Sequence, residues 1–424
     1  MTQDLPDDET NLYRAITAVS SIAVLATYYV FNVAHKPKIY ANNGTLQNFL
    51  SKNMPSLKDT YWPSWFSWEG RLQSALGLNL RIARTEKLPY RRQILQLQDG
   101  GQLAVDFLGE SSDDVANEPK LVVLLLPGLT SSSNTSYVKT LAMTIVKSNA
   151  IVAVLNNRGL GGVPLKTPRT YCCTNNEDIR EVIAHLKSQY PKSKFLAIGT
   201  SLGGMMLSRY VISWPDEARS TFVAALVISI CWDAMIGNAS LEKPFLNKYI
   251  VNYTLTSNLQ NLAKRHRTVL ESRRDCWDFD KVFSVKTIRE FDHHFTAPQF
   301  GFSSWEEYYT AAQITPEIHK FSIPVFGLNA IDDPMQPGED LPIKQAIQKG
   351  SNLALIVTER GGHLGFLEGI FPFRKPFHYM ERLVGEFVNA IRLHAEELLE
   401  EKTVDNLEGS TTLNEPQVEI AGVC

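Results

Sequence analysis

The sequence predicts an α/β fold in which helices cover both faces of a mostly parallel sheet. Short, uniformly apolar runs such as residues 121–126 and 353–357 are typical of strands that are buried on both faces. Stretches such as residues 379–399 repeat apolar side chains at three and four positions and indicate helices. Strands that alternate with helices form parallel sheets. The chain has 424 residues, 44% of them hydrophobic and 21% charged, which excludes a disordered, collagen-like or coiled-coil protein.

Two segments precede the predicted sheet. Residues 1–14 form an acidic N-terminal tail. Residues 15–34 carry no charge, and at about 1.5 Å per residue they are long enough to cross a hydrocarbon core of roughly 30 Å. We interpret them as one transmembrane anchor. A cleaved signal peptide is the main alternative, but the preceding residues are acidic and no small-residue cleavage site follows. A buried core helix is the other alternative.

The orientation of this anchor is left open by the sequence. Arg14 precedes the span, whereas Lys36, Lys38 and Lys52 follow it, which places the large domain on the cytosolic side. Against this, glycosylation sequons begin at four asparagines. They are Asn43, Asn134, Asn238 and Asn252.

The rest of the chain divides into a membrane-proximal segment at residues 35–89, a core in two parts at 90–235 and 322–395, and a helical cap insertion at 236–321 between them. The insertion is predicted because no convincing core strand occurs there. An acidic disordered tail at 396–424 ends the chain. The eight predicted strands are residues 93–97, 103–108, 121–126, 151–155, 195–198, 222–231, 323–328 and 353–357, and the predicted helices are residues 137–148, 176–188, 202–212 and 379–399.

The charge distribution argues against a nucleic-acid-binding protein, and the cysteines argue against a disulfide framework or a metal site. The formal net charge is −3, but the two tails are acidic, so the body between them is mildly basic at +7. Such a body tolerates an anionic membrane surface, yet it lacks the clustered basic residues of a nucleic-acid binder. We interpret the five cysteines as thiols, mostly buried, because they are odd in number and lack metal-ligand spacing. They are Cys172, Cys173, Cys231, Cys276 and Cys424.

A G-x-S-x-G motif at residues 199–203 directly follows a predicted strand and precedes a predicted helix. A serine at such a sharp turn stands clear of the backbone, and the small neighbours let the chain pass closely through the strained geometry. We therefore predict Ser201 as a catalytic nucleophile.

A serine nucleophile needs a base and an acid further along the chain, in the order Ser, Asp, His. His363 follows a core strand and two glycines, so we predict that it is the base. Asp333 and Asp332 both follow the preceding strand, and we prefer Asp333 because the turn should leave it pointing along the sheet edge. Asp233, after an earlier strand, is a third candidate.

The loop after the strand 121–126 is predicted to form the oxyanion hole. The backbone N–H groups of Leu129 and Leu202 would converge on the developing negative charge. We predict no cofactor and no metal, because dinucleotide, phosphate-loop and zinc-protease motifs are absent from the sequence.

Over residues 36–395 the chain resembles the membrane-anchored α/β-hydrolase domain-containing proteins. Segments 167–173 and 361–369 are the most specific and point to members one and three of that family rather than member two. The segments that carry the resemblance are residues 68–73, 125–130, 156–159, 167–173, 199–204, 240–244, 289–292 and 361–369.

This resemblance implies an α/β-hydrolase fold with a mostly parallel sheet, a helical cap and one preceding transmembrane helix. It also implies a phospholipase A-type serine hydrolase that releases fatty acid from phosphatidylcholine, anchored with type II topology. We expect a single-pass signal-anchor in the endoplasmic reticulum or another endomembrane. Membrane lipids are the expected substrates, with no nucleic acid and no obligate protein partner. The alternatives are an acylglycerol lipase, a general carboxylesterase, and a non-catalytic lipid-binding or receptor protein on the same fold.

Overall fold

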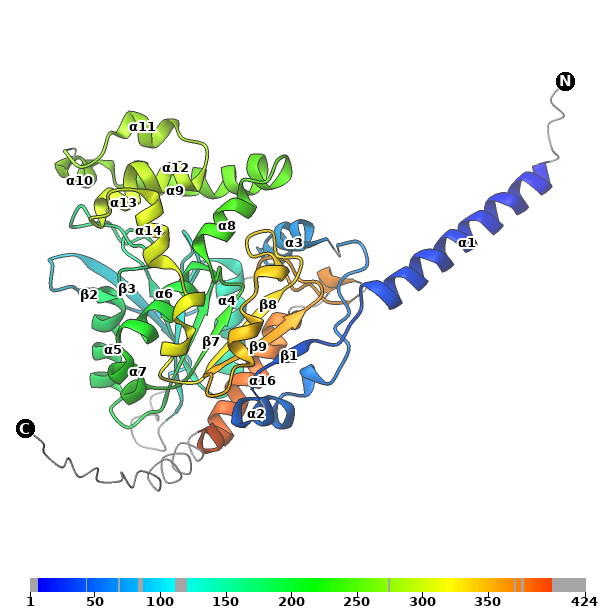
Figure 1. Ribbon diagram of the computed structural model, residues 1–424, viewed down its shortest axis with the longest axis horizontal. Coiled ribbons are helices and arrows are strands. Elements are labelled where there is room, and N and C mark those ends of the chain that lie inside the picture. Colours follow the sequence, from blue (N-terminus) through cyan, green and yellow to red (C-terminus); the bar gives the residue numbers. More distant parts are fainter. Residues whose placement is uncertain are drawn as a thin grey trace, which may run out of the picture.

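A nine-stranded sheet lies at the centre of the computed structural model, in the order β1-β9-β8-β7-β6-β4-β5-β3-β2 (Figure 1). The structure describes residues 7–42, 44–67, 69–82, 87–110, 120–273, 275–369, 371–374 and 377–398. The strands are β1 (Lys38–Tyr40), β2 (Arg91–Gln96), β3 (Gln102–Leu108), β4 (Val122–Leu126), β5 (Ile151–Asn156), β6 (Phe195–Thr200), β7 (Phe222–Ile228), β8 (Val325–Ala330) and β9 (Leu353–Thr358).

The predicted α/β class with a mostly parallel sheet is confirmed. Neighbouring strands from β5 through β4, β6, β7 and β8 to β9 are all parallel, whereas β3 and β2 are added antiparallel at one edge. The predicted count of eight strands was wrong, because β1 pairs antiparallel with β9 at the other edge. This three-residue strand is too short to show a period in the sequence, and its pairing partner lies more than 300 residues away.

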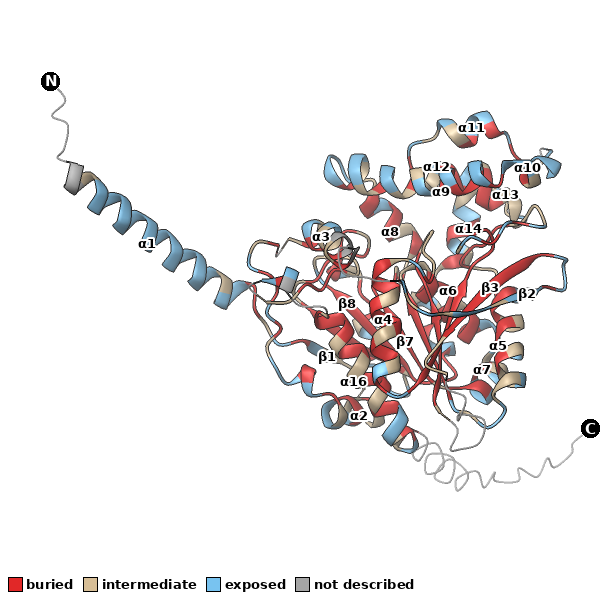
Figure 2. Cartoon of the chain, turned by 180° about the vertical axis from the view of Figure 1, so that it is seen from behind, coloured by how far each residue is buried: buried red, intermediate tan, exposed pale blue. Residues whose placement is uncertain are grey.

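Helices cover both faces of the sheet (Figure 2). Side chains of α2, α4 and α16 pack on one face, and those of α5 and α6 pack on the other. The helices are α1 (Asp7–Asn32), α2 (Thr45–Asn53), α3 (Gly70–Ile82), α4 (Ser136–Lys147), α5 (Glu177–Gln189), α6 (Leu202–Ser213), α7 (Pro215–Thr221), α8 (Ala234–Leu241), α9 (Tyr253–Arg265), α10 (Arg267–Leu270), α11 (Phe279–Ser284), α12 (Ile288–Phe291), α13 (Ala297–Gln299), α14 (Trp305–Ala312), α15 (Ile343–Ala346) and α16 (Tyr379–His394).

The described residues between β7 and β8 form helices and turns, and they lie over one end of the sheet as a cap (Figure 1). Part of the cap has a core of its own, in which Trp277 packs edge to face on Phe295 and Phe291 packs on it at a tilt. Burial of aromatic side chains is a large source of stability for so small a cluster. The cap is therefore a packed unit rather than a loose loop.

The helix α1 projects from the body and is exposed along its length (Figures 1 and 2). Its segment Thr10–Asn32 is long and apolar enough to cross a membrane, with a mean hydropathy of 1.5 and none of its best window buried. The helix includes residues 7–14, which the sequence assigned to the acidic tail. Its end is tied to the body, because Tyr29 stacks on Trp62 at 6.0 Å and His35 pairs with Tyr61.

Beyond α16, the chain continues as a short 3₁₀ helix at Ala395–Leu398, where Glu397 pairs with Lys52 at 2.6 Å. The rest of the predicted acidic tail lies outside the described residues, as do Cys424 and the sequon asparagine Asn43. Asn238 and Asn252 are buried, and Asn134 is exposed. Of the three sequons whose asparagine is described, only Asn134 is therefore open to an oligosaccharide in the folded chain.

Candidate active site

Ser201 lies between β6 and α6 in a left-handed conformation, with φ 51° and ψ −124°. Residues other than glycine rarely adopt it, and such strain is typical of functional sites. A Cβ atom on Gly199 would come within 2.5 Å of the Gly204 Cα atom, and one on Gly203 would lie 2.2 Å from a carbonyl oxygen of β4. Close backbone approach therefore demands both glycines of the G-x-S-x-G motif. The hydroxyl of Ser201 is presented at the carboxyl end of the central strand β6.

The structure brings Ser201, His363 and Asp333 together. His363 Nε2 lies 2.8 Å from Ser201 Oγ, and Nδ1 lies 2.9 Å and 3.2 Å from the two carboxylate oxygens of Asp333. A proton on Nδ1 would donate to Asp333 and leave Nε2 free to accept the serine proton. The arrangement can thus activate the hydroxyl for attack on an electrophilic carbon.

The three candidate acids differ clearly in position. Asp333 is buried, points at His363 and also accepts a hydrogen bond from the Met335 N–H at 2.8 Å. Asp233 instead caps the first turn of α8 by accepting from two backbone N–H groups. Asp332 accepts a bond from the Gly362 N–H at 2.8 Å. Only Asp333 of the three contacts the imidazole.

The loop after β4 places Leu129 beside the serine, since both residues line the same two cavities. The N–H of Gly128 donates to the Tyr137 hydroxyl at 2.8 Å, and that of Thr130 donates to the Tyr171 hydroxyl at 2.9 Å. Between these two bonds, the Leu129 N–H makes no hydrogen bond to another described residue. Leu202 is the first residue of α6, so its N–H has no acceptor within the helix. Both predicted oxyanion donors are therefore free to bind an anion.

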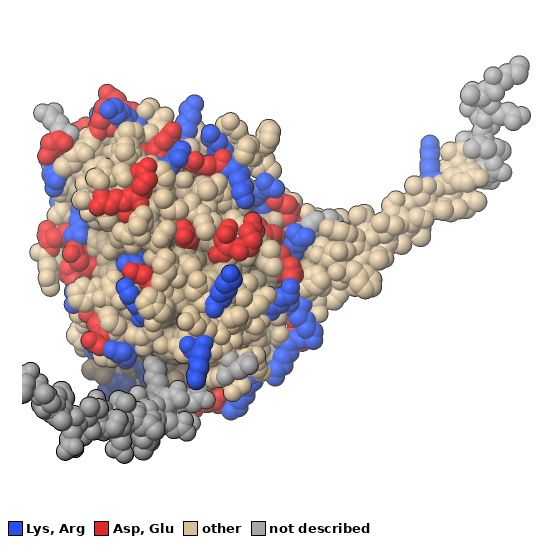
Figure 3. Space-filling view, viewed as in Figure 1, with Lys and Arg blue, Asp and Glu red and all other residues tan. Residues whose placement is uncertain are grey.

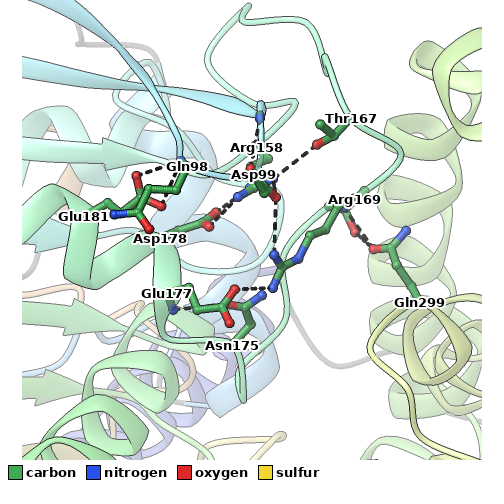
Figure 4. Close-up of polar contacts among 12 residues, drawn as sticks. Gln98, Asp99, Arg158, Thr167, Arg169, Asn175, Glu177, Asp178, Glu181 and Gln299 are labelled. Carbon is green, nitrogen blue, oxygen red and sulfur yellow. Dashed lines mark hydrogen bonds and ion pairs between the residues drawn. The ribbon is translucent and has the colours of Figure 1, made fainter.

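An ion-pair cluster holds the loop 167–173 that carries Tyr171 (Figure 4). The buried Arg158 forms two bonds of 2.7 Å with Asp178 and one of 2.6 Å with Asp99, and it also donates to Thr167 Oγ1. Gln299 of the cap accepts from the Thr170 N–H at 3.0 Å. Since the Tyr171 hydroxyl accepts the Thr130 N–H, the cluster also helps to hold the loop after β4 in place.

The helix α3 braces the loop that carries His363, which the sequence did not predict. Ser74 Oγ accepts the His363 N–H at 2.8 Å, and Gln73 Oε1 accepts the Leu367 N–H at 2.8 Å. A Cβ atom on Gly362 would lie 2.0 Å from the Gly70 carbonyl oxygen, so the two segments are in backbone contact. The only sequence signal for this contact was that segment 68–73 carries part of the family resemblance. The histidine loop that it contacts is nearly 300 residues away.

A buried ion pair fixes the other end of α3. Arg81 Nε lies 2.7 Å from Glu381 Oε1 of α16, and Arg81 also donates to the Leu364 and Gly365 carbonyls of the histidine loop. Burial by itself would raise the pKa of Glu381, but the Arg81 charge and its hydrogen bonds lower it to about 2. The carboxylate therefore stays ionised, and the pair links α3, α16 and the histidine loop.

Asp332 is a titratable group that takes no part in the contacts among Ser201, His363 and Asp333. Its Oδ2 atom is buried and has no hydrogen-bond partner among the described residues. Burial raises the pKa of this carboxyl to about 7, and the nearby charge of Asp333 acts in the same direction. In the folded chain it therefore keeps its proton up to near-neutral pH, whereas in the unfolded chain it ionises near pH 4.

We expect Asp332→Asn to remove a pH-dependent loss of stability. In the native chain, the contribution of Asp332 to the free energy of unfolding falls as pH rises from about 4 to about 7, because the unfolded state loses this proton first. The loss at pH 8 is on the order of 4 kcal/mol. Asparagine cannot ionise and still offers an oxygen to the Gly362 N–H. Thermal unfolding at pH 5 and pH 8, with the exposed Glu339→Gln as control, measures the difference. Equal pH dependence in both variants would contradict this assignment.

Two cavities meet at Ser201 and His363. The smaller, of about 140 Å³, is lined mainly by apolar side chains that include Leu262, Phe291 and Phe295. The larger, of about 620 Å³, runs between α3 and the start of α9. A mostly apolar pocket with a few convergent polar groups is typical of a small-molecule site.

The thiols near the site have no chemical role in this geometry. Cys172, Cys173 and Cys231 line the smaller cavity as free cysteines. Burial raises the pKa of the Cys172 thiol to about 11 and that of Cys231 to about 12, so both stay protonated and unreactive. Within the described part of the chain, no group of three or more His, Cys, Asp or Glu side chains is arranged to hold a metal ion.

Similarity to known proteins extends over most of the chain. A sequence profile of the serine aminopeptidase S33 family matches residues 117–297. The chain is 38% identical to Phospholipase ABHD3 of Homo sapiens, covering 88% of this chain and 89% of that protein. It is 31% identical to Protein abhd-3.2 of Caenorhabditis elegans, with 89% and 97% covered. To Monoacylglycerol lipase ABHD2 of Homo sapiens it is 26% identical, with 84% and 85% covered.

Proposed function

This chain belongs to the α/β-hydrolase domain-containing family, and from that membership we propose that it is a serine hydrolase of lipid carboxylic esters. The observation that carries the proposal is the contact of His363 with both Ser201 and Asp333 where two apolar cavities meet. Three residues that follow three separate strands converge on one point, as nucleophilic catalysis requires. Relatives named as a phospholipase and a monoacylglycerol lipase support a lipid ester as the substrate.

The proposed reaction is acyl transfer in two steps. Ser201 Oγ attacks the acyl carbonyl carbon while His363 Nε2 takes the hydroxyl proton, and the Asp333 carboxylate stabilises the resulting imidazolium. The N–H groups of Leu129 and Leu202 donate to the oxyanion. Collapse of the intermediate breaks the ester bond, and His363 returns the proton to the departing alcohol. Water, activated by the same imidazole, then releases the fatty acid and restores the serine.

We propose phosphatidylcholine as the lipid, with phospholipase A-type release of one fatty acid. The relative of highest identity reported above is named a phospholipase, and its similarity covers both the core and the cap. In this proposal the smaller cavity takes the scissile acyl chain, because Leu262, Phe291 and Phe295 give it an apolar wall. The larger cavity receives the rest of the lipid.

We also propose that α1 is a single-pass signal-anchor in the endoplasmic reticulum or another endomembrane. Its apolar length and its exposure support this role. The anchor would hold the site beside its lipid substrate, and the basic body would favour an anionic surface.

The full-length protein in phosphatidylcholine vesicles tests the proposal. We expect free fatty acid and lysophosphatidylcholine in equal amounts by mass spectrometry, and covalent labelling by a fluorophosphonate probe. Parallel samples contain a monoacylglycerol or a short water-soluble ester. Turnover of the monoacylglycerol alone would mean an acylglycerol lipase, and turnover of the soluble ester alone would mean a general carboxylesterase. Neither turnover nor labelling would mean a non-catalytic lipid-binding protein.

A further inference from the structure

One segment of the cap exposes an unusual number of aromatic side chains. From the end of α8 to the first residue of α9, Phe245, Tyr249 and Tyr253 are 79%, 67% and 53% exposed. Tyr249 and Tyr253 are four residues apart on the helical stretch that runs from Asn247 into α9, so they share one face of it, and Phe245 precedes this stretch in a turn with φ 64°. We call these three residues the aromatic row. Large exposed aromatic side chains that cluster mark an interaction surface.

The aromatic row lies beside the entrance to the larger cavity. Leu246, Ile250 and Thr254, each the next residue along, line that cavity together with the catalytic Ser201 and His363. One face of the segment therefore looks into the cleft, and the adjacent face carries the aromatic row outward. The opposite wall of the cleft is α3, where Leu72 is exposed as well.

The cap segment and the end of α1 are on the same side of the body. In both views, α3 lies between the segment after α8 and the base of α1 (Figures 1 and 2). Four further exposed aromatic residues belong to the two segments at the base of α1, where Trp62 stacks on Tyr29 of α1 and the Gly369 N–H donates to the Trp62 carbonyl. They are Trp62, Trp65, Phe371 and Phe373. A bilayer that holds α1 would thus meet both groups of aromatic side chains.

The charge of the segment matches a lipid surface. From residue 244 to residue 263 the only charged residue is Lys248, and Lys243 stands just before them. In Figure 3 the surface at this end of the cap is mostly uncharged, with basic side chains beside it. Aromatic residues prefer the membrane interface, and lysines there face anionic headgroups.

We propose that the aromatic row docks the cap onto the same membrane that holds α1. The docked segment holds the mouth of the larger cavity against the bilayer, so that a lipid passes from the leaflet to Ser201 without crossing water. The passage of a lipid to Ser201 rests on the proposed function. The docking of the cap onto the membrane does not require catalysis.

Hydrolysis of a bilayer lipid and of a short soluble ester, measured side by side, tests whether the lipid enters from the membrane. We compare the full-length wild type in phosphatidylcholine vesicles with a combined Phe245→Ser, Tyr249→Ser and Tyr253→Ser variant, whose altered residues do not line the cleft. We expect hydrolysis of the bilayer lipid to fall by about tenfold or more. Turnover of a short soluble ester should change less than about twofold. The control variant Ile347→Ser with Leu393→Ser removes two apolar side chains elsewhere that are 52% and 53% exposed, and it should preserve both activities. A parallel loss of both activities in the aromatic-row variant, or no loss at all, would overturn the proposal.

Depth in the bilayer gives a readout that is independent of hydrolysis. In a Ser201→Ala background, Tyr249→Trp and Leu393→Trp are each reconstituted with phosphatidylcholine brominated on its acyl chains. After subtraction of the background variant, we expect strong quenching of the added fluorescence for Tyr249→Trp and little for Leu393→Trp, which lies at the far end of α16. Equal quenching at the two positions would overturn the docking. Because this chain is inactive in either case, the result stands whether or not the proposed function holds.

Discussion

Ser201→Ala is expected to lower kcat for lipid-ester hydrolysis by about 10⁶-fold, because removal of the serine of a triad abolishes nearly all of its catalysis. Alanine fits the left-handed turn no worse than serine, so the fold should be retained. Single-turnover release of fatty acid from vesicles measures the loss, and thermal unfolding of the same preparation checks the structure. The His363–Asp333 contact of 2.9 Å does not involve the serine and should persist.

The labelling experiment sharpens this expectation. A fluorophosphonate probe should modify the wild type and leave Ser201→Ala unmodified. Residual hydrolysis within tenfold of the wild type, in a preparation free of other hydrolases, would remove Ser201 from the mechanism. Labelling of the alanine variant would point to a different nucleophile.

Asp333→Asn is expected to lower kcat by about 10⁴-fold, because asparagine favours the wrong tautomer of the histidine. The effect should appear in kcat rather than in KM, since Asp333 is buried behind His363 and away from both cavities. Steady-state kinetics on phosphatidylcholine vesicles measures both parameters.

Asp233→Asn is the matched control, because this aspartate was also a candidate acid. The side chain of Asp233 caps α8, and asparagine caps a helix as well as aspartate does. We expect its kcat to stay within about twofold of the wild type. If Asp233→Asn lost activity as severely as Asp333→Asn, the assignment of the acid would be wrong.

Local patterns in the chain were enough to predict much of this site. The Ser201 turn could be recognised because its strand, its two glycines and its helix are consecutive. His363 and Asp333 each follow a strand directly, and parallel strands place their carboxyl ends along one edge of the sheet. Asp333 was preferred over Asp332 because of the expected geometry of a single turn. In the structure, only Asp333 of the two contacts the imidazole.

Long-range packing was not predictable in the same way. The strand β1 and the helix α3 come from a segment that the sequence treated as a connection to the membrane. Both are held by contacts with residues near the C-terminus. The strand β1 pairs with β9, and the helix α3 contacts the histidine loop and Glu381. No short-range periodicity encodes a contact across 300 residues.

The order of strands β2 to β9 along the chain, the apolar span of α1 and the turn at Ser201 follow from the sequence alone, because each depends on neighbours within a few residues. Tertiary structure decided which aspartate reaches the imidazole, which helix steadies the histidine loop, and which side of the cap faces the base of α1. These depend on how distant segments share one core, where close backbone contacts such as Gly70 with Gly362 leave room for a single arrangement.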